Sequence, residues 1–317
     1  MNSLSLFLML HSLAILPMPG RAFWPYFAGT VLLAVGLMVI AKNEARQAQG
    51  MDRAVVFGPL FLAVPMGVFG ADHFIAPRVV AAMVPSWIPG HLFWTYLVGA
   101  ALIAAAFSIV IKKHAALAAT LLGFMIFSFV LLIHMPNVAR FNNRFALVVL
   151  LRDLSFSGGA LAFATTQMKQ RSGSSSRKML ALLRALIAVP ALVFGVQHFL
   201  HPQFVPVIPL NLLMPLWIPG RLALSYITGA VLIACGLSMV LNWRARLAAT
   251  WLGIIVFLIV MLVYLPMVIA APADIGNGLN YFVDTLAFSG ASLVLAGALP
   301  RDEAHTYQNR STALSSA

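Results

Sequence analysis

Residues 64–74 of the chain read VPMGVFGADHF, and residues 189–199 read VPALVFGVQHF. The two stretches share VP, VFG and HF at the same spacing, which indicates that one half of the sequence repeats the other. The match continues in WIPG at 87–90 and 217–220, in LAAT at 117–120 and 247–250, and in FSG at 156–158 and 288–290. Because a repeat limits the folds that a chain can adopt, this duplication is the first constraint on the structure.

The composition places the chain in a lipid bilayer. Apolar residues make up 62% of the sequence and charged residues only 9%, and the mean hydropathy is +0.95. A helix needs about 20 apolar residues to cross the hydrocarbon core. Nine stretches meet this requirement, at 22–41, 54–76, 91–111, 115–135, 145–167, 180–200, 221–241, 246–269 and 281–299. Residues 3–16 form a shorter tenth candidate, so we expect an all-α bundle of about ten transmembrane helices.

The basic residues predict the orientation of these helices. With ten spans, one side of the membrane receives fourteen of the 20 lysines and arginines and the other side receives five, while Arg152 falls inside a span. Loops rich in Lys and Arg stay in the cytoplasm. We therefore expect both termini to be cytoplasmic, and we call the side that carries Arg78, Arg144 and Arg221 the predicted outer face.

Each copy of the repeat holds four spans, so both copies are expected to have the same orientation, as parallel repeats. The predicted organisation is a first four-helix unit at 51–168, a cytoplasmic linker at 169–178 and a second unit at 179–300. Residues 18–29 (MPGRAFWPYFAG) resemble residues 88–99 (IPGHLFWTYLVG), so residues 1–50 form a two-helix half repeat. Residues 301–317 are polar and are expected to form a disordered tail.

Several classes of function are excluded or left open by the motifs. The net charge of +12 is spread over many loops, which argues against a nucleic-acid partner. Cys235 is the single cysteine, so an internal disulfide is impossible. No phosphate-binding loop, dinucleotide fingerprint, serine elbow or cysteine metal cluster occurs. These observations decide neither for nor against an enzyme, and they predict no metal site.

The first group of candidate ligand-binding residues lies at the predicted outer face. His73 and His198 end the first helix of each unit, and Trp87 and Trp217 precede the next helix. Tryptophan prefers the membrane interface, so an aromatic cap would explain this element. Asp72 beside His73 favours a binding role instead, because an unpaired charge inside a span is costly.

The second group lies in the last two helices of each unit. Asp153 and Asp284 are acids inside spans, and each is expected to face protein or water and to find a partner. Arg152 is adjacent to Asp153, although neighbouring helix positions point about 100° apart, whereas Asp284 has no cation nearby in the sequence. His134 aligns with Tyr264, and both can donate hydrogen bonds at an interface. A clamp between helices, ligand binding and proton transfer are the three interpretations of these groups.

Five elements of the first unit carry a family resemblance. They are HFxxP at 73–77, WIPG at 87–90, LAATxxG at 117–123, LxxHxP at 131–136 and RDL followed by SGGA within 152–160. This pattern resembles the DoxX family of four-helix membrane proteins. The resemblance extends over both units, with Tyr264 in place of His134 in the second.

The resemblance implies a location in the bacterial inner membrane and an association with quinones or redox complexes. The leading hypothesis is that Asp72, His73, His134, Arg152 and Asp153 bind a quinone-like lipophilic molecule, with redox-complex subunits as partners besides the lipid bilayer. No other cofactor is indicated. A small-molecule transporter is the first alternative, because two parallel repeats can enclose a cleft, and a noncatalytic membrane scaffold is the second.

Overall fold

The computed structural model describes residues 20, 22–44, 46–141, 144–172 and 176–301, without the side chains of 141 and 169–172. The helices are α2 (Phe23–Asn43), α3 (Asp52–Val55), α4 (Gly58–Ile75), α5 (Pro77–Ala81), α6 (His91–Val110), α7 (Ala115–Phe129), η1 (Val130–His134), α8 (Met135–Phe141), α9 (Arg144–Ser172), α10 (Arg177–Leu200), α11 (Arg221–Val240), α12 (Ala245–Ile259), η2 (Val260–Tyr264), α13 (Leu265–Ala270), η3 (Ile275–Leu279) and α14 (Asn280–Ala298). The elements η1, η2 and η3 are π-helical.

Nine helices of the described residues are long and apolar enough to cross a membrane. They coincide with the nine spans expected from the sequence, which confirms an all-α, multi-pass architecture. Residues 3–16, the tenth candidate span, lie outside the described residues. The linker expected at 169–178 is short, because α9 continues to Ser172 and α10 begins at Arg177.

Two glycines open the helices that follow the WIPG motifs. Gly90 and Gly220 adopt the left-handed backbone region, with φ of 73° and 62°, directly before α6 and α11. A side chain at either position would be strained in this conformation. The expectation that WIPG begins a helix is therefore confirmed at both sites.

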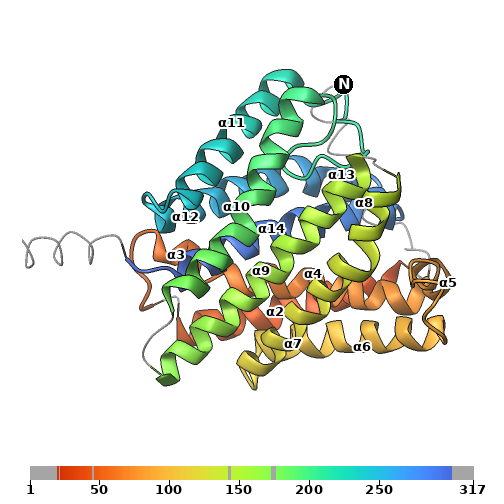
Figure 1. Cartoon of the computed structure of the whole chain (residues 1–317), viewed down its shortest axis with the longest axis horizontal. Helices are drawn as coiled ribbons and strands as arrows, with labels where there is room; N and C mark the ends of the chain where they lie inside the picture. Colours follow the sequence, from red (N-terminus) through yellow and green to blue (C-terminus); the bar gives the residue numbers. More distant parts are fainter. Residues whose placement is uncertain (1–19, 21, 45, 142–143, 173–175, 302–317) are drawn as a thin grey trace, which may run out of the picture.

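The last span, α14, runs through the centre of the bundle, where Figure 1 shows it in blue behind α9. It packs against α4, α9 and α12. Small side chains make this possible, because Ser289, Gly290, Ala291 and Ser292 follow one another and all are buried. Without such residues, helices in lipid cannot approach closely.

The helices of 51–168 and 179–300 interlock. Within 51–168, α4 packs on α6 and α7 on α9; within 179–300, α10 packs on α11 and α12 on α14. Across these ranges, α4 packs on α14 while α10 packs on α9. The first helix of each range therefore lies against the last helix of the other.

Glycines at aligned positions make these crossings. A Cβ atom on Gly290 would lie 2.4 Å from the backbone nitrogen of Leu62 in α4. At the aligned position, a Cβ atom on Gly158 would lie 2.7 Å from Cβ of Leu186 in α10. Both distances are too short for two unbonded heavy atoms, so only glycine permits the observed helix spacing.

A π-helical turn occurs in each of the two long spans that contain an internal proline near their ends. The π turns η1 and η2 lie directly before Pro136 and Pro266. Proline lacks the amide hydrogen that would bond to the preceding turn and its ring crowds that turn's carbonyl, and a wider π turn accommodates it. His134 and Tyr264 each occupy the last position of these turns.

We expect Gly290→Ala to lower the free energy of unfolding by about 1–3 kcal/mol, because an inserted methyl group must push α14 away from the α4 backbone. Unfolding of the purified protein in mixed micelles by titration with a denaturing detergent measures the change. Gly276→Ala is the control, since its added Cβ atom would lie 3.8 Å from the nearest side-chain atom. Equal stability of the two variants would contradict this account of the crossing.

Candidate functional site

A chain of three polar contacts joins α9 to α14 and η1. Arg152 donates from Nε to Oδ1 of Asp153 at 2.8 Å and from Nη1 to Oδ2 of Asp284 at 2.9 Å. His134 Nε2 lies 2.9 Å from Oδ2 of Asp153. Because a carboxylate only accepts hydrogen bonds, this contact places a hydrogen on Nε2 of His134. We call His134, Arg152, Asp153 and Asp284 the ionic network.

Arg152 therefore supplies the cation for both acids. Its long side chain reaches back to the adjacent Asp153 and across to Asp284, which is 132 positions away in the sequence. Asp284 has no cation nearby in the sequence, so its partner, Arg152, comes from the other half of the chain. Asp284 is 3% exposed and Asp153 8%, so both carboxylates lie in the interior of the bundle.

The ionic network lies well inside the membrane-spanning region. Arg152 is eight residues after the start of α9 at Arg144, and Asp284 is nine residues after the start of η3 at Ile275. With a rise of about 1.5 Å per residue, both lie roughly 12 Å from the helix ends at the predicted outer face. An unpaired charge at this depth costs several kcal/mol, so the mutual pairing satisfies groups that lipid cannot.

A second polar group lies between α4 and α14, beside the ionic network. Asp72 of α4 is within side-chain hydrogen-bonding reach of Asn280 and close enough to Asp284 to feel its charge. One Oδ1 atom on each of Asp72, Asn280 and Asp284 is buried and has no hydrogen-bond partner among the described residues. The sequence analysis did not identify Asn280, although it precedes Asp284 by one helical turn.

His73 does not join either group. Its Nδ1 atom lies 2.7 Å from the carbonyl oxygen of Phe69, one turn earlier in α4, and donates a hydrogen bond to it. The Cα atom of Gly99 faces the β-carbon of His73, so α6 packs closely at this point. The structure therefore turns this histidine toward its own helix, away from His134 and Asp153.

His198 and Tyr264 hold a loop of their own half. The loop between α10 and α11 has a buried segment, 205–210. His198 Nε2 accepts a hydrogen bond from the amide of Val207 at 3.0 Å, and the Tyr264 hydroxyl group donates to the carbonyl oxygen of Pro206. Both side chains are fully buried, and their role in the structure is to fix this loop.

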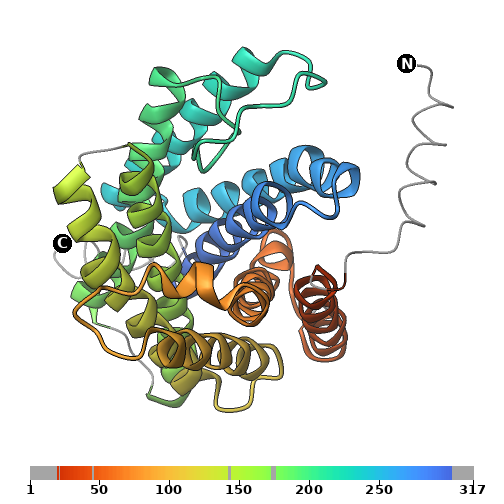
Figure 2. The same cartoon turned by 90° about the vertical axis from the view of Figure 1, so that its right-hand side faces the viewer.

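Arg144 fixes the same loop from α9. Its guanidinium group donates to the carbonyl oxygens of Pro209 and Leu210 and to the side chain of Asn211. It also lies over the ring of Phe204, 4.1 Å from the centroid. We call residues 201–220 the plug loop, and Figure 2 shows it in green to teal at the top of the bundle.

The corresponding loop, 76–90, is five residues shorter and folds differently. It forms the short helix α5, which packs on α4 and α6. Trp87 and Trp217, near the ends of the two loops, are 69% and 54% exposed. Neither tryptophan contacts the ionic network, and their exposure suits the membrane interface predicted for them.

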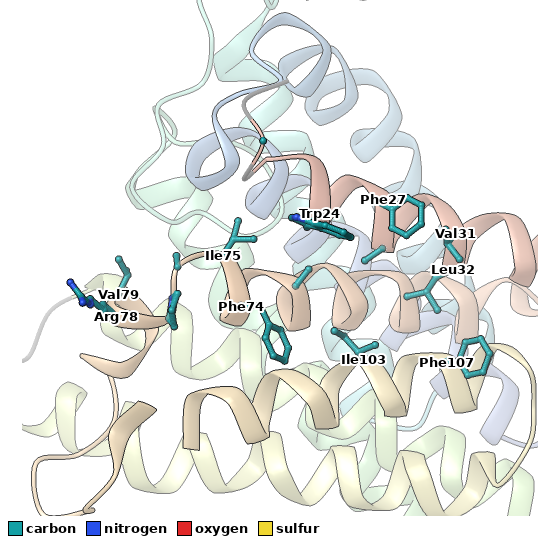
Figure 3. A pocket seen from close by; sticks show the side chains of 15 residues that line it. Trp24, Phe27, Val31, Leu32, Phe74, Ile75, Arg78, Val79, Ile103 and Phe107 are labelled. Carbon is teal, nitrogen blue, oxygen red and sulfur yellow. The ribbon is translucent and has the colours of Figure 1, made fainter. Parts of the chain in front are cut away.

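An apolar recess lies elsewhere, in a groove between α2, α4, α5 and α6. Its volume is about 1080 Å³, and Figure 3 shows the side chains that face it. They are Gly20, Trp24, Phe27, Ala28, Val31, Leu32, Ala71, Phe74, Ile75, Ala76, Pro77, Arg78, Val79, Ile103 and Phe107. The ten candidate residues of the sequence analysis do not line this groove.

The groove exists because α2 and α6 both pack on α4. The resemblance of residues 18–29 to 88–99 was the available signal, since two similar helices against one partner leave a furrow between them. Arg78 and Trp24 are the polar side chains among the lining residues, and no acidic side chain faces the furrow.

Of the ten candidate residues, the structure joins His134, Arg152, Asp153 and Asp284 in one network and places Asp72 beside it. His73, Trp87, His198 and Trp217 do not join that network, and Tyr264 lies close enough to Asp284 to feel its charge while its hydroxyl group bonds to the plug loop. Among the described residues, no group of three or more His, Cys, Asp or Glu side chains is arranged to hold a metal ion. Comparison of the chain with protein-family models, curated proteins and solved structures finds no match.

We expect Arg152→Leu to lower the free energy of unfolding by about 3–5 kcal/mol, because it leaves two buried carboxylates without their cation. Detergent-induced unfolding measures the loss. Arg221→Leu, at an exposed position at the start of α11, should change the stability little. A loss of the same size in both variants would contradict the stabilising role assigned to the buried ion pairs of Arg152.

We expect Tyr264→Phe to loosen the plug loop, because the carbonyl group of Pro206 loses its donor at a cost of about 1–3 kcal/mol. Hydrogen exchange should become faster at the amide of Val207 and along 205–210. Tyr226→Phe, at a side chain that is 41% exposed, is the matched control. Unchanged exchange in the Tyr264 variant would contradict the role assigned to its hydroxyl group.

Proposed function

We propose that the protein is a DoxX-like, multi-pass protein of the bacterial inner membrane that binds a quinone-like lipophilic molecule in the groove between α2, α4 and α6. The groove is the single observation that carries this proposal. Its walls are mostly aliphatic and aromatic, and it opens on a surface of transmembrane helices. A molecule dissolved in the bilayer can therefore enter it without crossing water.

The size of the groove suits such a ligand. Pockets for small molecules usually enclose about 300–1,000 Å³, and the groove, at about 1080 Å³, lies just above this range. It is an elongated furrow along α4, as Figure 3 shows, with Phe107 toward one end and Arg78 at the other. An elongated apolar space with one polar end matches a ring that carries a hydrocarbon tail.

The lining supplies two hydrogen-bond donors. Arg78, at one end, has a guanidinium group, and Trp24, nearer the middle of the groove (Figure 3), has an indole N–H; neither side chain can accept a hydrogen bond through these nitrogens. Donors without a facing carboxylate suit carbonyl oxygens, which are the polar atoms of a quinone. In this proposal the ionic network does not touch the ligand, and it holds α9 and α14 together.

We further infer that the chain contains two pseudo-symmetric repeats, 51–168 and 179–300, with a half repeat that adds α2. The aligned crossings of Gly158 and Gly290 and the aligned π turns support this inference. Cytoplasmic termini rest on the distribution of Lys and Arg. The role as a subunit of a redox complex rests on the DoxX resemblance.

A noncatalytic scaffold is the second candidate function. The mutual pairing of His134, Arg152, Asp153 and Asp284 favours it, because each of these side chains already has a charged or hydrogen-bonding partner within the network. On this alternative the groove would hold bulk lipid and would not discriminate between lipophiles.

We expect a photoreactive short-chain benzoquinone to cross-link to α2 and α6 of the protein in lipid nanodiscs, and a nonreactive quinone to compete. Ala28→Trp places a large side chain in the groove, so cross-linking should fall about tenfold, which corresponds to about 1.4 kcal/mol. Mass spectrometry of the labelled peptides measures the result.

Leu33→Trp is the control, because Leu33 is an exposed residue of α2 that does not line the groove. It should leave cross-linking unchanged. Equal labelling of both variants, or labelling that excess phospholipid removes as readily as excess quinone, would refute a quinone-like ligand and favour the scaffold.

A further inference from the structure

We propose that Asp72, Asn280 and Asp284 form a proton-binding site between α4 and α14, in which the carboxyl group of Asp72 carries an exchangeable proton. The site is separate from the groove. Ala71 and Ile75 of α4 line the groove, whereas Asp72 faces α14 from the same helix. The proposal therefore stands whether or not a lipophile binds.

The carboxyl groups of this region outnumber the guanidinium groups that pair with them. Asp72, Asp153 and Asp284 bring three carboxyl groups into one buried region, and Arg152 is the guanidinium group that pairs there. Its hydrogen bonds go to Asp153 and Asp284, and Asp72 receives none of them. In an apolar medium an uncompensated carboxylate is far more costly than a neutral carboxylic acid.

Two buried oxygen atoms of this site are unsatisfied. Oδ1 of Asp72 and Oδ1 of Asn280 have no donor in the part of the chain that the structure describes. Buried polar atoms normally have a partner, and each exception demands an explanation. A proton on Asp72 would convert one of its carboxyl oxygens into a donor, and the Asn280 side chain, which is within hydrogen-bonding reach of Asp72, would offer its unpartnered Oδ1 as the acceptor.

Asp284 is itself only partly satisfied. The residue is 3% exposed, and among the described residues its Oδ1 has no partner while its Oδ2 binds Arg152. Asp284 lies close enough to Asp72 for their charges to repel. One proton between them removes this repulsion, and Asp284 keeps the negative charge that its bond to Arg152 requires.

The surrounding elements contribute few other titratable groups. Toward this region, η1 contributes His134, η2 contributes Tyr264, α9 contributes Arg152 and Asp153, and α14 contributes Tyr281 in addition to Asn280 and Asp284. From α2, Tyr26 approaches the start of η3, and its hydroxyl group donates to the carbonyl oxygen of Pro272 at 2.9 Å. On α4 itself, His73 is bonded to Phe69. In the described part of α6, residues 92–110 contain no charged side chain.

The other half of the chain offers an internal comparison. Gln197 occupies the position in α10 that Asp72 occupies in α4, and Val148 of α9 aligns with Asn280. An amide cannot exchange a proton in this way, so the proposed site belongs to the α4 side alone. Asp72→Gln is therefore a mild substitution, because the corresponding position of α10 already holds a glutamine.

A carbodiimide provides the direct test, because this apolar reagent modifies protonated carboxyl groups and not carboxylates. We expect dicyclohexylcarbodiimide to label Asp72 of the protein in nanodiscs at neutral pH and to label it less as the pH rises. Asp153 and Asp52, which are paired with arginines, should remain unlabelled. Peptide mass spectrometry identifies the modified residue.

Asp72→Asn and Asp72→Gln should abolish the labelling while the variants keep the thermal stability of the parent protein. Asp274→Asn, at an exposed acid before η3, is the control and should leave labelling unchanged. As a second measurement, infrared spectra should show a carboxylic acid band that both Asp72 variants lack and that shifts in heavy water.

Three results would overturn the proposal. The first is labelling that persists in Asp72→Asn. The second is the absence of both the label and the infrared band in the parent protein. The third is labelling that falls when sodium is added at constant pH, because the oxygen atoms would then hold a metal cation in place of the proton.

Discussion

The bridge from Arg152 to Asp153 and Asp284 is the interaction on which the bundle depends. It couples α9 and α14, which are the helices through which the two halves of the chain meet. Charges inside the membrane region must be paired, and the pair forms only if the backbones lie close together. Gly159 of α9 provides this closeness, because a Cβ atom there would lie 2.6 Å from Cβ of Ala291 in α14, so electrostatics and packing at the centre require each other.

Around this common centre the two halves differ in what covers their ends. The longer plug loop folds into the second half, where His198, Tyr264 and Arg144 bind its backbone. The shorter loop 76–90 forms α5 beside the groove, where α2 supplies one wall. One half is therefore closed by its own chain, and the other presents an apolar recess to the bilayer.

The sequence predicted the elements far better than their partners. Nine spans, including the two that begin after the WIPG motifs, followed from apolar length. Asp153 and Asp284 were recognised as groups that need partners, because lipid offers none. The sequence did not show that Arg152 is the cation of Asp284, because a contact across 132 positions depends on which helices pack together.

What the sequence determined by itself was therefore the set of helices and the presence of costly polar groups within them, because both follow from the local cost of placing side chains in hydrocarbon. The tertiary structure decided which polar groups meet. His73 bonds to the backbone of its own helix, and Tyr264 and His198 bond to the plug loop. Among the described residues, Oδ1 of Asp72 and Oδ1 of Asn280 have no donor. It also created the groove, because a furrow between α2 and α6 exists only when both helices pack on α4.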